Sequence, residues 1–432
     1  MKWLVAGAFA VWASCAVIRW IASPPLSHDE AHYALASRDL LAGDPPRWIY
    51  MSIGTQMVAA PGVAAGGSER ALRALPALLG LVFLACAWRV AAVLAGEESA
   101  AWAIAVLAGT TPVTRFQIDL MSDMPSCACL LAAIAILVGE LRRDRGPRWR
   151  IIAAAPLAAA ALYIRYGSVV PLAIIGIATL GFAKARGKLV VTGLVFALCV
   201  PPLVHTLVVS AGVPPPESGL ATYARHPIAY AGALATLLAV VAIAGAWRDR
   251  WWLYAAVIGA ADIVALGLET QAQSRYILLG IVLLVAVGSA VAHDVAKRAP
   301  RAVTVVCAMA VVVSWIAAIS SAWHARDHRI AGMASTLAAA DAIHRDAHGR
   351  ACVVVGRHTT QLEWYSGCRI AYDATGLAYV VRDDTGGPDQ PAPVRGTTIL
   401  HTPHVDVTRA STPASATRAG PSRSRGRSRA RR

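Results

Sequence analysis

The sequence carries the run YILLGIVLLVAVGSAVA at residues 276–292, which contains no charged side chain. Ten further apolar blocks accompany it, at 3–22, 71–94, 100–117, 124–140, 151–163, 167–183, 189–209, 227–246, 252–268 and 302–322. A helix needs roughly 20 apolar residues to cross the hydrocarbon core of a bilayer. The pattern predicts an all-α polytopic membrane protein with about 11 transmembrane helices. The block at 151–163 is short, and a kinked or re-entrant hairpin with the next block is an alternative for it.

The composition of the 432 residues agrees with this prediction. Hydrophobic residues make up 57% of the chain and charged residues 15%, and the mean hydropathy is +0.54. Soluble domains carry about 25% charged residues. The composition therefore excludes an ordinary soluble enzyme, and it excludes disorder over most of the chain.

Basic residues cluster between alternate apolar blocks. They are Arg142, Arg143, Arg145, Arg148, Arg150, Lys184, Arg186, Lys188, Arg248, Arg250, Lys297, Arg298 and Arg301, together with Lys2. In the eleven-span topology these residues all fall on one side of the membrane. The positive-inside rule predicts that this side is cytoplasmic. We expect a multi-pass protein of the cell (inner) membrane, with its N-terminus in the cytoplasm and its C-terminus outside. These loops and a further basic run, Arg423 to Arg432, contribute to the net charge of +15, and no nucleic-acid-binding motif accompanies them.

The chain divides into three parts in this topology. Residues 1–322 form the transmembrane domain, with an external loop at 23–70 that is expected to contain amphipathic helices. Residues 323–407 alternate helical and β-rich stretches and predict a small extracytoplasmic α/β domain. Its expected elements are a helix at 330–348, strands at 351–355, 369–372, 379–382 and 397–401, and a helix that Thr360 and Glu363 open in capping-box spacing. Residues 408–432 have the composition of a disordered Arg/Ser-rich tail.

Two cysteines in the predicted external domain differ from the other six. Cys352 and Cys368 lie in polar sequence and can pair if this region is exported, because disulfides form in oxidising compartments. The remaining cysteines lie in apolar blocks, where a buried thiol behaves as a small hydrophobic side chain.

The stretch SHDEAHY at residues 27–33 follows the first apolar block directly. Ser27 and Glu30 have the S-x-x-E spacing of a capping box, which predicts a helix start at the outer membrane surface. On that helix Asp29, His32 and Tyr33 share one face. Such a face places a carboxylate at the depth where a lipid-linked substrate presents its headgroup. The alternative is structural: Glu30 caps the helix, and Asp29 complements its dipole.

A second pair of acids precedes the block at 124–140. Asp119 and Asp123 are four residues apart, so a helix places them on one face at the external boundary. Two like charges in this position are unfavourable unless a cation or a substrate hydroxyl lies between them. A solvated helix end is the alternative.

Two arginine–tyrosine pairs lie on the same predicted external side. Arg275 and Tyr276 precede the last but one block, and Arg165 and Tyr166 lie between the fifth and sixth blocks. An arginine at the external start of a helix opposes both the positive-inside rule and the helix dipole, so it requires an anionic partner. A lipid phosphate fits this requirement, because guanidinium binds phosphate oxygens in a bidentate manner. Contact with ordinary lipid headgroups explains each pair equally well.

These motifs, taken in order, resemble the GT-C superfamily of membrane glycosyltransferases. The branch most similar is that of the protein O-mannosyltransferases and the lipid A aminoarabinose transferases, which use polyprenyl-phosphate-linked sugars. The resemblance rests on Asp29-Glu30 with Tyr33, on GGSERALRALPAL at 66–78, on Thr111-Pro112 before Asp119 and Asp123, and on RYIL at 275–278. It covers about two-thirds of the chain, through roughly residue 290. The stretch YMSIGTQ at 50–56 departs from the basic-Pro-Pro segment that many members carry.

The resemblance implies a catalytic acid in the first external loop, here Asp29. It also implies that Asp123 or Asp119 assists binding or coordinates a divalent cation. Together with the reading of the residues, it gives Glu30, His32, Tyr33, Asp119, Asp123, Arg165, Arg275 and Tyr276 as substrate-binding residues. Asp29 is expected to act as the general base and Arg275 to bind the leaving phosphate. The chemistry of a monophosphate donor requires no cofactor, and a divalent cation is compatible with it.

The function predicted from the sequence is transfer of a sugar from a polyprenyl-phosphate donor to a lipid, glycan or protein acceptor on the extracytoplasmic face. A lipid-linked-sugar flippase or transporter is the main alternative, and a non-catalytic scaffold for envelope assembly is a third. A transporter places its ionisable residues near the bilayer midplane. The acids and arginines of this sequence gather instead at span boundaries, which favours the enzyme. Asp262, within a span, is read as a buried polar contact.

Overall fold

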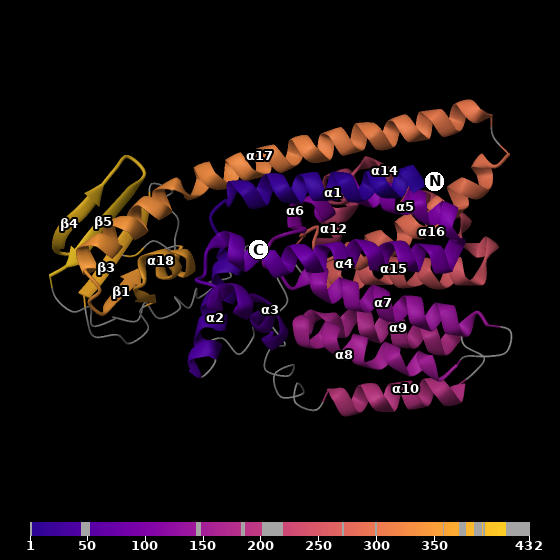
Figure 1. Cartoon of the computed structure of the whole chain (residues 1–432), viewed down its shortest axis with the longest axis horizontal. Helices are drawn as coiled ribbons and strands as arrows, with labels where there is room; N and C mark the ends of the chain where they lie inside the picture. Colours follow the sequence, from indigo (N-terminus) through magenta and orange to yellow (C-terminus); the bar gives the residue numbers. More distant parts are fainter. Residues whose placement is uncertain are drawn as a thin grey trace, which may run out of the picture. The chain divides into compact units, whose positions relative to one another are not determined.

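The computed structural model describes residues 2–44, 52–143, 148–182, 186–200, 219–269, 272–298, 300–356, 358–370, 377–383, 391 and 394–411. The chain divides into two compact units, Met1–Ile330 and Ala331–Arg432. The first unit is a bundle of apolar helices, and the second contains a small β-sheet (Figure 1). The fold class predicted from the sequence is confirmed.

The helical unit contains elements with the following bounds. The α-helices are α1 (Lys2–Ala22), α2 (His28–Ala42), α3 (Ile53–Ala64), α4 (Glu69–Ala95), α5 (Glu97–Ala108), α6 (Thr111–Phe116), α7 (Asp123–Leu141), α8 (Ala154–Ile164), α9 (Val169–Phe182), α10 (Arg186–Cys199), α12 (Gly219–Arg225), α13 (Pro227–Ala231), α14 (Ala233–Gly245), α15 (Arg250–Glu269), α16 (Leu278–Ala296) and the first part of α17 (Arg301–Ala347). Three short 3₁₀ helices are η1 (Trp149–Ala153), η2 (Tyr166–Ser168) and η3 (Ala246–Arg248).

Each predicted span coincides, at least in part, with one of these helices. Within the described residues six helices are long and apolar enough to cross a membrane, namely α1, α4, α7, α15, α16 and α17. The helices α8, α9, α10 and α14 are apolar but shorter, so the number of eleven crossings stays a prediction. The predicted span at 100–117 divides into α5 and α6, and residues 201–209 of the predicted seventh span lie outside the described residues.

The helices of the bundle pack through small and aliphatic side chains. The buried core includes Phe83, Leu84, Ile104, Leu131 and Val282. The backbones of α14 and α16 approach closely, because a Cβ atom built on Gly288 would lie 2.0 Å from the carbonyl oxygen of Leu238. Small residues at helix contacts allow such approach of two backbones in a membrane protein.

The loop at 23–70, which the sequence predicts to be external, contains α2 and α3, which lie beside each other at one end of the bundle (Figure 1). The predicted capping box opens α2: the Glu30 backbone N–H donates to Ser27 Oγ, and the Ser27 N–H donates to Glu30 Oε2 at 2.8 Å. Gly43 ends the helix in the left-handed conformation with φ 75°. Residues 45–51 of the predicted loop lie outside the described residues.

The two ends of the bundle differ in their charged residues. Asp123 opens α7, Arg275 precedes α16, and Asp29 follows the end of α1. The opposite ends of these three helices meet Arg142, Lys297 and Lys2. The basic loops and the candidate site residues therefore lie at opposite ends of the same helices, as the topology predicted from the sequence requires.

The second unit begins within α17, a single helix of 47 residues. The sequence predicted a domain boundary after residue 322 and a separate helix at 330–348, and both predictions differ from the structure. The residues AWHARDHR at 322–329 contain no Pro or Gly, so the last span and the following helix continue as one. The boundary between the units falls after Ile330.

The sheet of the second unit has the strand order β2-β1-β3-β5-β4. Its strands are β1 (Cys352–Val355), β2 (Arg369–Ile370), β3 (Leu377–Asp383), β4 (Gly396–His401) and β5 (Val405–Ala410). β1 pairs in parallel with β2 and β3, whereas β5 pairs in antiparallel with β3 and β4. The sequence missed β5. Thr408 and Arg409 pair with β3, so ordered structure continues three residues past the predicted boundary at 407.

Helix α18 (Thr359–Ser366) connects β1 to β2. Its N-cap is His358, not Thr360, and Glu363 accepts a hydrogen bond from the Ile370 N–H at 3.2 Å. The predicted capping box in this unit is therefore wrong. Cys352 and Cys368 form a disulfide that ties β1 to the end of this connection. The predicted tail from 412 onward lies outside the described residues.

Candidate active site

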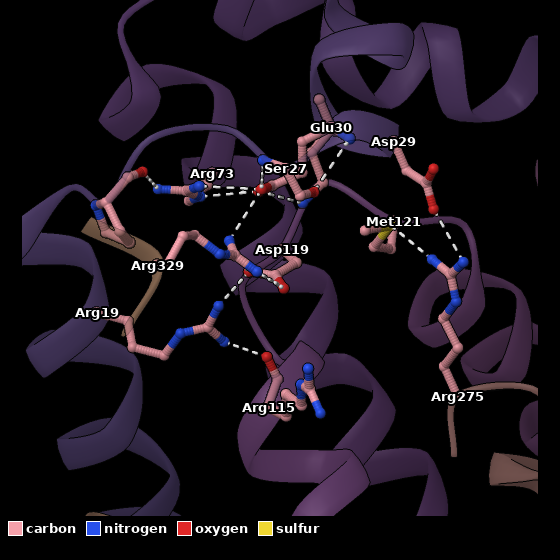
Figure 2. A network of polar contacts seen from close by, with 12 residues as sticks. Arg19, Ser27, Asp29, Glu30, Arg73, Arg115, Asp119, Met121, Arg275 and Arg329 are labelled. Atoms are coloured by element: carbon pink, nitrogen blue, oxygen red, sulfur yellow. Dashed lines mark hydrogen bonds and ion pairs between the residues drawn. The ribbon is translucent and has the colours of Figure 1, made fainter. Parts of the chain in front are cut away.

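The site is built around an ion pair between Asp29 and Arg275. Asp29 lies in the first turn of α2, and its Oδ2 accepts a hydrogen bond from Arg275 Nη2 at 2.8 Å (Figure 2). The Asp29 side chain is 43% exposed, and that of Arg275 is 12% exposed. The sequence positions are 246 residues apart, and the expectation that these two groups converge is met.

Neighbouring elements hold Arg275 in place. Its Nε donates to Gln273 Oε1 at 2.7 Å, and its Nη1 contacts the sulfur of Met121 at 3.1 Å. The Gln273 backbone is fixed in turn by Tyr223 of α12, whose hydroxyl donates to the Gln273 carbonyl at 2.9 Å. The guanidinium is therefore positioned before any substrate contacts it.

Asp123, Arg165 and Tyr276 complete what we call the acid–arginine cluster (Asp29, Asp123, Arg165, Arg275 and Tyr276). Asp123 lies 3.3 Å from Arg165 Nη1 and 3.9 Å from Arg275 Nε. The ring of Tyr276 has the two guanidinium carbons at 4.9 and 5.1 Å from its centroid. A ring between two guanidinium groups keeps both cations in fixed positions.

The surroundings of Arg275 stabilise its charge. Burial opposes the charged form, but Asp123, Tyr276 and Asp29 outweigh burial and raise the pKa of Arg275 above its ordinary value. Arg275 therefore remains a cation at every physiological pH.

His32 and Tyr33 lie on the same helix as Asp29 and are uncharged at neutral pH. Burial, together with the neighbouring His28, lowers the pKa of His32 to about 4. Burial raises the pKa of Tyr33, whose hydroxyl bonds to Ser122 beside Asp123. These two side chains can offer hydrogen bonds to a substrate, but no charge.

Glu30 lies in a different environment from its neighbour Asp29. Its side chain is fully buried and pairs with Arg73 Nε at 2.9 Å and Arg329 Nη1 at 3.0 Å. It also accepts hydrogen bonds from the backbone N–H groups of Ser27 and Leu120. Burial opposes its charge, yet Arg73 and Arg329 hold the pKa of this carboxyl well below its usual range. The Glu30 carboxylate is held by protein donors, and the substrate-binding role predicted for it stays a prediction.

Asp119 belongs to the same assembly, which we call the buried ion network (Arg19, Glu30, Arg73, Asp119 and Arg329). Asp119 pairs with Arg19 and, at 3.1 Å, with Arg329 Nη2 (Figure 2). Its side chain has no exposed surface. Asp119 and Asp123 have different arginine partners, and the binding role predicted for Asp119 stays a prediction.

A cavity of about 710 Å³ opens beside the ion pair. Its lining includes Asp29, Arg275 and Arg329 together with Arg115, His226 and Tyr230. Three guanidinium groups and one carboxylate thus face it from the described residues. This balance suits an anionic group next to a single accessible carboxylate.

Comparison with known proteins agrees with this geometry. The family model for dolichyl-phosphate-mannose-protein mannosyltransferase matches residues 57–205. The structure of ArnT from Cupriavidus metallidurans bound to undecaprenyl phosphate aligns with a TM-score of 0.68 at 15% identity, covering 94% of this chain and 97% of that chain. Apo ArnT aligns with a TM-score of 0.67 at 14% identity and the same coverage. The chain shares its fold with ArnT.

A more distant GT-C structure extends the comparison. The archaeal oligosaccharyltransferase AglB from Archaeoglobus fulgidus, in complex with an inhibitory peptide and a dolichol-phosphate, aligns with a TM-score of 0.61 at 13% identity. The alignment covers 85% of this chain and 64% of that chain. No curated protein matches the sequence. The resemblance to the GT-C superfamily that the motifs indicated is confirmed.

The acids of the candidate site pair with arginines. Among the described residues no group of three or more His, Cys, Asp or Glu side chains could hold a metal ion. Asp119 faces Arg19 and Arg329, and Asp123 faces Arg165 and Arg275. Both carboxylates face arginine side chains, and the divalent cation that the sequence allows stays a prediction.

Sequence reasoning missed three arginines of the candidate site. Arg19 lies inside the first span, where a charged residue requires a buried partner, and this signal could have indicated its pairing. Arg73 was part of the quoted motif, but its partner Glu30 was not foreseen. Arg329 lies in α17, far along the chain, and no local pattern distinguishes it from other basic residues.

Proposed function

We propose that this chain is a membrane glycosyltransferase that moves a sugar from a polyprenyl-phosphate donor to an acceptor on the extracytoplasmic face of the cell (inner) membrane. The match to the mannosyltransferase family model supports the activity. The fold shared with ArnT bound to undecaprenyl phosphate, and with AglB bound to dolichol-phosphate, supports the class of donor. The acceptor is a lipid, a glycan or a protein, and the sugar is a hexose or a pentose.

The observation that carries this proposal is the accessible Asp29 carboxylate paired with Arg275 at the wall of a cationic cavity. Glycosyl transfer from a lipid phosphate needs a proton acceptor for the attacking hydroxyl and a cation for the leaving phosphate. Asp29 and Arg275 provide these two groups within one hydrogen bond of each other. Asp123, Arg165 and Tyr276 hold Arg275 in place and extend the phosphate-binding surface.

In the proposed reaction the acceptor oxygen attacks the anomeric carbon of the donor. The acceptor proton passes to Asp29, and the bond between the anomeric carbon and the phosphate oxygen breaks. The electron pair of that bond remains on the polyprenyl phosphate, whose added charge Arg275 stabilises in a partly buried environment. No cofactor takes part in this step.

A donor phosphate competes with Asp29 for the same guanidinium. While Asp29 is paired, its carboxylate is engaged by Arg275 Nη2 at 2.8 Å. Binding of the phosphate to Arg275 releases Asp29 toward the acceptor hydroxyl. The proposal thus links donor binding to activation of the base.

The transporter alternative is less consistent with the positions of the charged groups. The acid–arginine cluster and the buried ion network gather near the ends of α1, α7 and α16. Asp262, within α15, is fully buried and accepts a hydrogen bond from the Gly280 N–H at 3.0 Å. One buried acid held by a backbone donor does not make a pathway across the bundle.

Replacement of Asp29 by Asn tests the proposal. A general base contributes about 10²–10⁴-fold to a rate, so Asp29→Asn should reduce transfer by this amount. The measurement is mass analysis of envelope lipids and glycans in a deletion strain complemented with each variant. Asp44→Asn, an exposed acid just after the same helix, is the matched control and should restore the wild-type products. Wild-type products in cells that carry Asp29→Asn would remove the proposed base.

A further inference from the structure

The cavity beside the ion pair has a second wall, which the proposed reaction does not use. Arg115 of α6, together with His226 and Tyr230 at α13, lines this side of the cavity. Helices α6 and α13 are in contact, so the three side chains belong to one surface, which we call the Arg115 wall (Arg115, His226 and Tyr230). The whole lining of the cavity belongs to the unit Met1–Ile330.

Arg115 presents an exposed guanidinium to this cavity. The guanidinium carbon lies 5.6 Å from the centroid of the ring of the next residue, Phe116. Among the described residues no carboxylate pairs with Arg115, whereas Arg275 and Arg329, the other two arginines of the cavity, both pair with carboxylates of the site. A guanidinium in this state is able to bind the oxygens of a carboxylate or a phosphate in a bidentate manner.

The other two side chains of the Arg115 wall add hydrogen-bonding groups. His226 is exposed, and Tyr230 is half-buried. Within the part of the chain that the structure describes, neither the His226 imidazole nor the Tyr230 hydroxyl has a hydrogen-bond partner. An imidazole and a phenol each carry a hydrogen-bond donor. The Arg115 wall therefore combines one cation with two further donors, which is a donor set for an oxyanion.

A chain of contacts fixes the Arg115 wall relative to Arg275. The ring of Tyr230 packs edge-on against that of Tyr223, with 5.0 Å between the centroids and 82° between the planes. The Tyr223 hydroxyl donates to the Gln273 carbonyl at 2.9 Å, and Gln273 Oε1 accepts from Arg275 Nε at 2.7 Å. The two sides of the cavity are therefore positioned together before a substrate binds.

Arg115 and Arg275 occupy different places in the cavity. Figure 2 shows their guanidinium groups apart from each other, and it shows the Arg115 carbonyl held by a hydrogen bond from Arg19. The volume of about 710 Å³ lies within the range of small-molecule sites, about 300–1,000 Å³, so the cavity has room for more than a phosphate group. A phosphate at Arg275 thus leaves Arg115 for a second negative group.

We propose that the Arg115 wall binds a second oxyanion of the substrates, a carboxylate or phosphate group carried by the transferred sugar or by the acceptor. The placement of the donor phosphate at Arg275 rests on the proposed function, whereas an anion site at Arg115 does not. The site then favours an acidic sugar or an acidic acceptor over a neutral one.

Isothermal titration calorimetry of the full-length protein in detergent tests this site. The probes are methyl glucuronide and methyl phosphate, with methyl glucoside as the neutral counterpart of the glucuronide. Each probe is titrated with and without saturating undecaprenyl phosphate, which occupies Arg275 in the proposed function. At least one of the two anions should bind the wild type under both conditions. Methyl glucoside should bind about tenfold more weakly or not at all, because it offers no charge to the guanidinium.

Three variants assign the binding to the Arg115 wall. Arg115→Gln should weaken the anion about tenfold or more, because a hydrogen bond to a charged group is lost, and should leave the affinity for undecaprenyl phosphate unchanged. Tyr230→Phe keeps the ring on Tyr223 and should weaken the anion about two- to tenfold. Arg225→Gln, an exposed residue of α12 outside the lining, removes the same charge as a matched control and should stay within about twofold of the wild type. Equal midpoints of thermal unfolding show that the fold is kept.

Three results would overturn the proposal. The first is that neither anion binds the wild type. The second is that Arg115→Gln binds the anion as tightly as Arg225→Gln does. The third is that Arg115→Gln weakens undecaprenyl phosphate instead of the probe, since Arg115 would then be a second ligand of the donor phosphate.

Mass analysis of the transfer products identifies the substrate that carries the oxyanion. An added mass equal to that of an acidic sugar assigns the oxyanion to the transferred sugar. A neutral sugar added to an acceptor that bears a phosphate or a carboxylate assigns it to the acceptor. A neutral sugar on a neutral acceptor would contradict the proposal.

The outcomes separate this inference from the proposed reaction. If Asp29→Asn keeps full transfer but Arg115→Gln loses the anion, the base is wrong and the anion site stands. If Arg115→Gln keeps the anion but Asp29→Asn loses transfer, the anion site is wrong and the base stands.

Discussion

Asp29 and Glu30 are consecutive residues in α2, and helix geometry directs their side chains about 100° apart. Glu30 turns inward to Arg73 and Arg329, and Asp29 turns toward the cavity and Arg275. The spacing of Ser27 and Glu30 was sufficient to predict the capping box. It was not sufficient to predict which of the two acids is buried and which lines the cavity. Their environments depend on arginines in α4, α17 and the turn before α16.

The variant Glu30→Gln should destabilise the protein, in contrast to Asp29→Asn. Removing one partner of a buried ion pair costs about 3–5 kcal/mol, and here it leaves Arg73 and Arg329 without their common carboxylate. Thermal unfolding in detergent at pH 7 should show a lower midpoint for Glu30→Gln and an unchanged one for Asp29→Asn.

The ion pair between Glu30 and Arg73 also predicts how the stability of the fold depends on pH. The pKa of Glu30 is lower in the folded protein than in the unfolded chain, so the ionised carboxyl stabilises the fold above about pH 4.3. This stabilisation is lost as the pH falls through the lowered pKa. The difference in midpoint between wild type and Glu30→Gln should therefore shrink in acid, and a difference that grows in acid would contradict the assignment.

Arg275→Ala should weaken binding of the polyprenyl-phosphate donor more than binding of the acceptor. A hydrogen bond to a charged group contributes about 1.5–3 kcal/mol, which corresponds to about 10–100-fold in the KM for the polyprenyl-phosphate donor. Initial rates measured against each substrate separate the two effects, and Arg345→Ala, an exposed residue of the second unit, is the control. Equal losses for donor and acceptor would argue against a phosphate contact.

At the scale of elements, the spans could be predicted because a helix that crosses the hydrocarbon core must be apolar over its length, and hydropathy measures this property. The ends of the helices were harder to place, since they depend on local breaks and on neighbours. Gly109 and Thr110 divide one predicted span into α5 and α6, whereas no helix-breaking residue interrupts α17 near 322. β5 was missed because its pairing partners, β3 and β4, define it more than its own sequence does.

The contact between α14 and α16 gives a prediction at this scale. A methyl group at residue 288 would lie 2.0 Å from the Leu238 carbonyl oxygen, so the two helix backbones must separate. Gly288→Ala should lower stability by about 1–3 kcal/mol, as overpacking of a core does. Gly176→Ala in α9, where the added Cβ meets no atom within 4 Å, should leave the midpoint of thermal unfolding unchanged or raise it. Equal midpoints for the two variants would mean that α14 and α16 do not approach so closely.

At the scale of the whole molecule, the charges separate along the helices of the first unit. The candidate site lies where α7 and α16 begin, and basic residues lie where they end. The sequence could predict this separation because the positive-inside rule depends only on loop composition. It could not predict the buried ion network, because that network joins α1, α2, α4, α17 and the segment before α7 only in the folded bundle.

The disulfide between Cys352 and Cys368 makes the orientation testable. Disulfides persist in oxidising compartments, so this pair is expected only if the second unit is exported. In a variant whose six other cysteines are replaced, a maleimide should label neither Cys352 nor Cys368 until a reductant is added. Lys297→Cys in the same background, at the basic end of α16, should react in intact cells only with a membrane-permeant maleimide. Free thiols at 352 and 368, or labelling of residue 297 by an impermeant reagent, would reverse the orientation and place Asp29 on the cytoplasmic side.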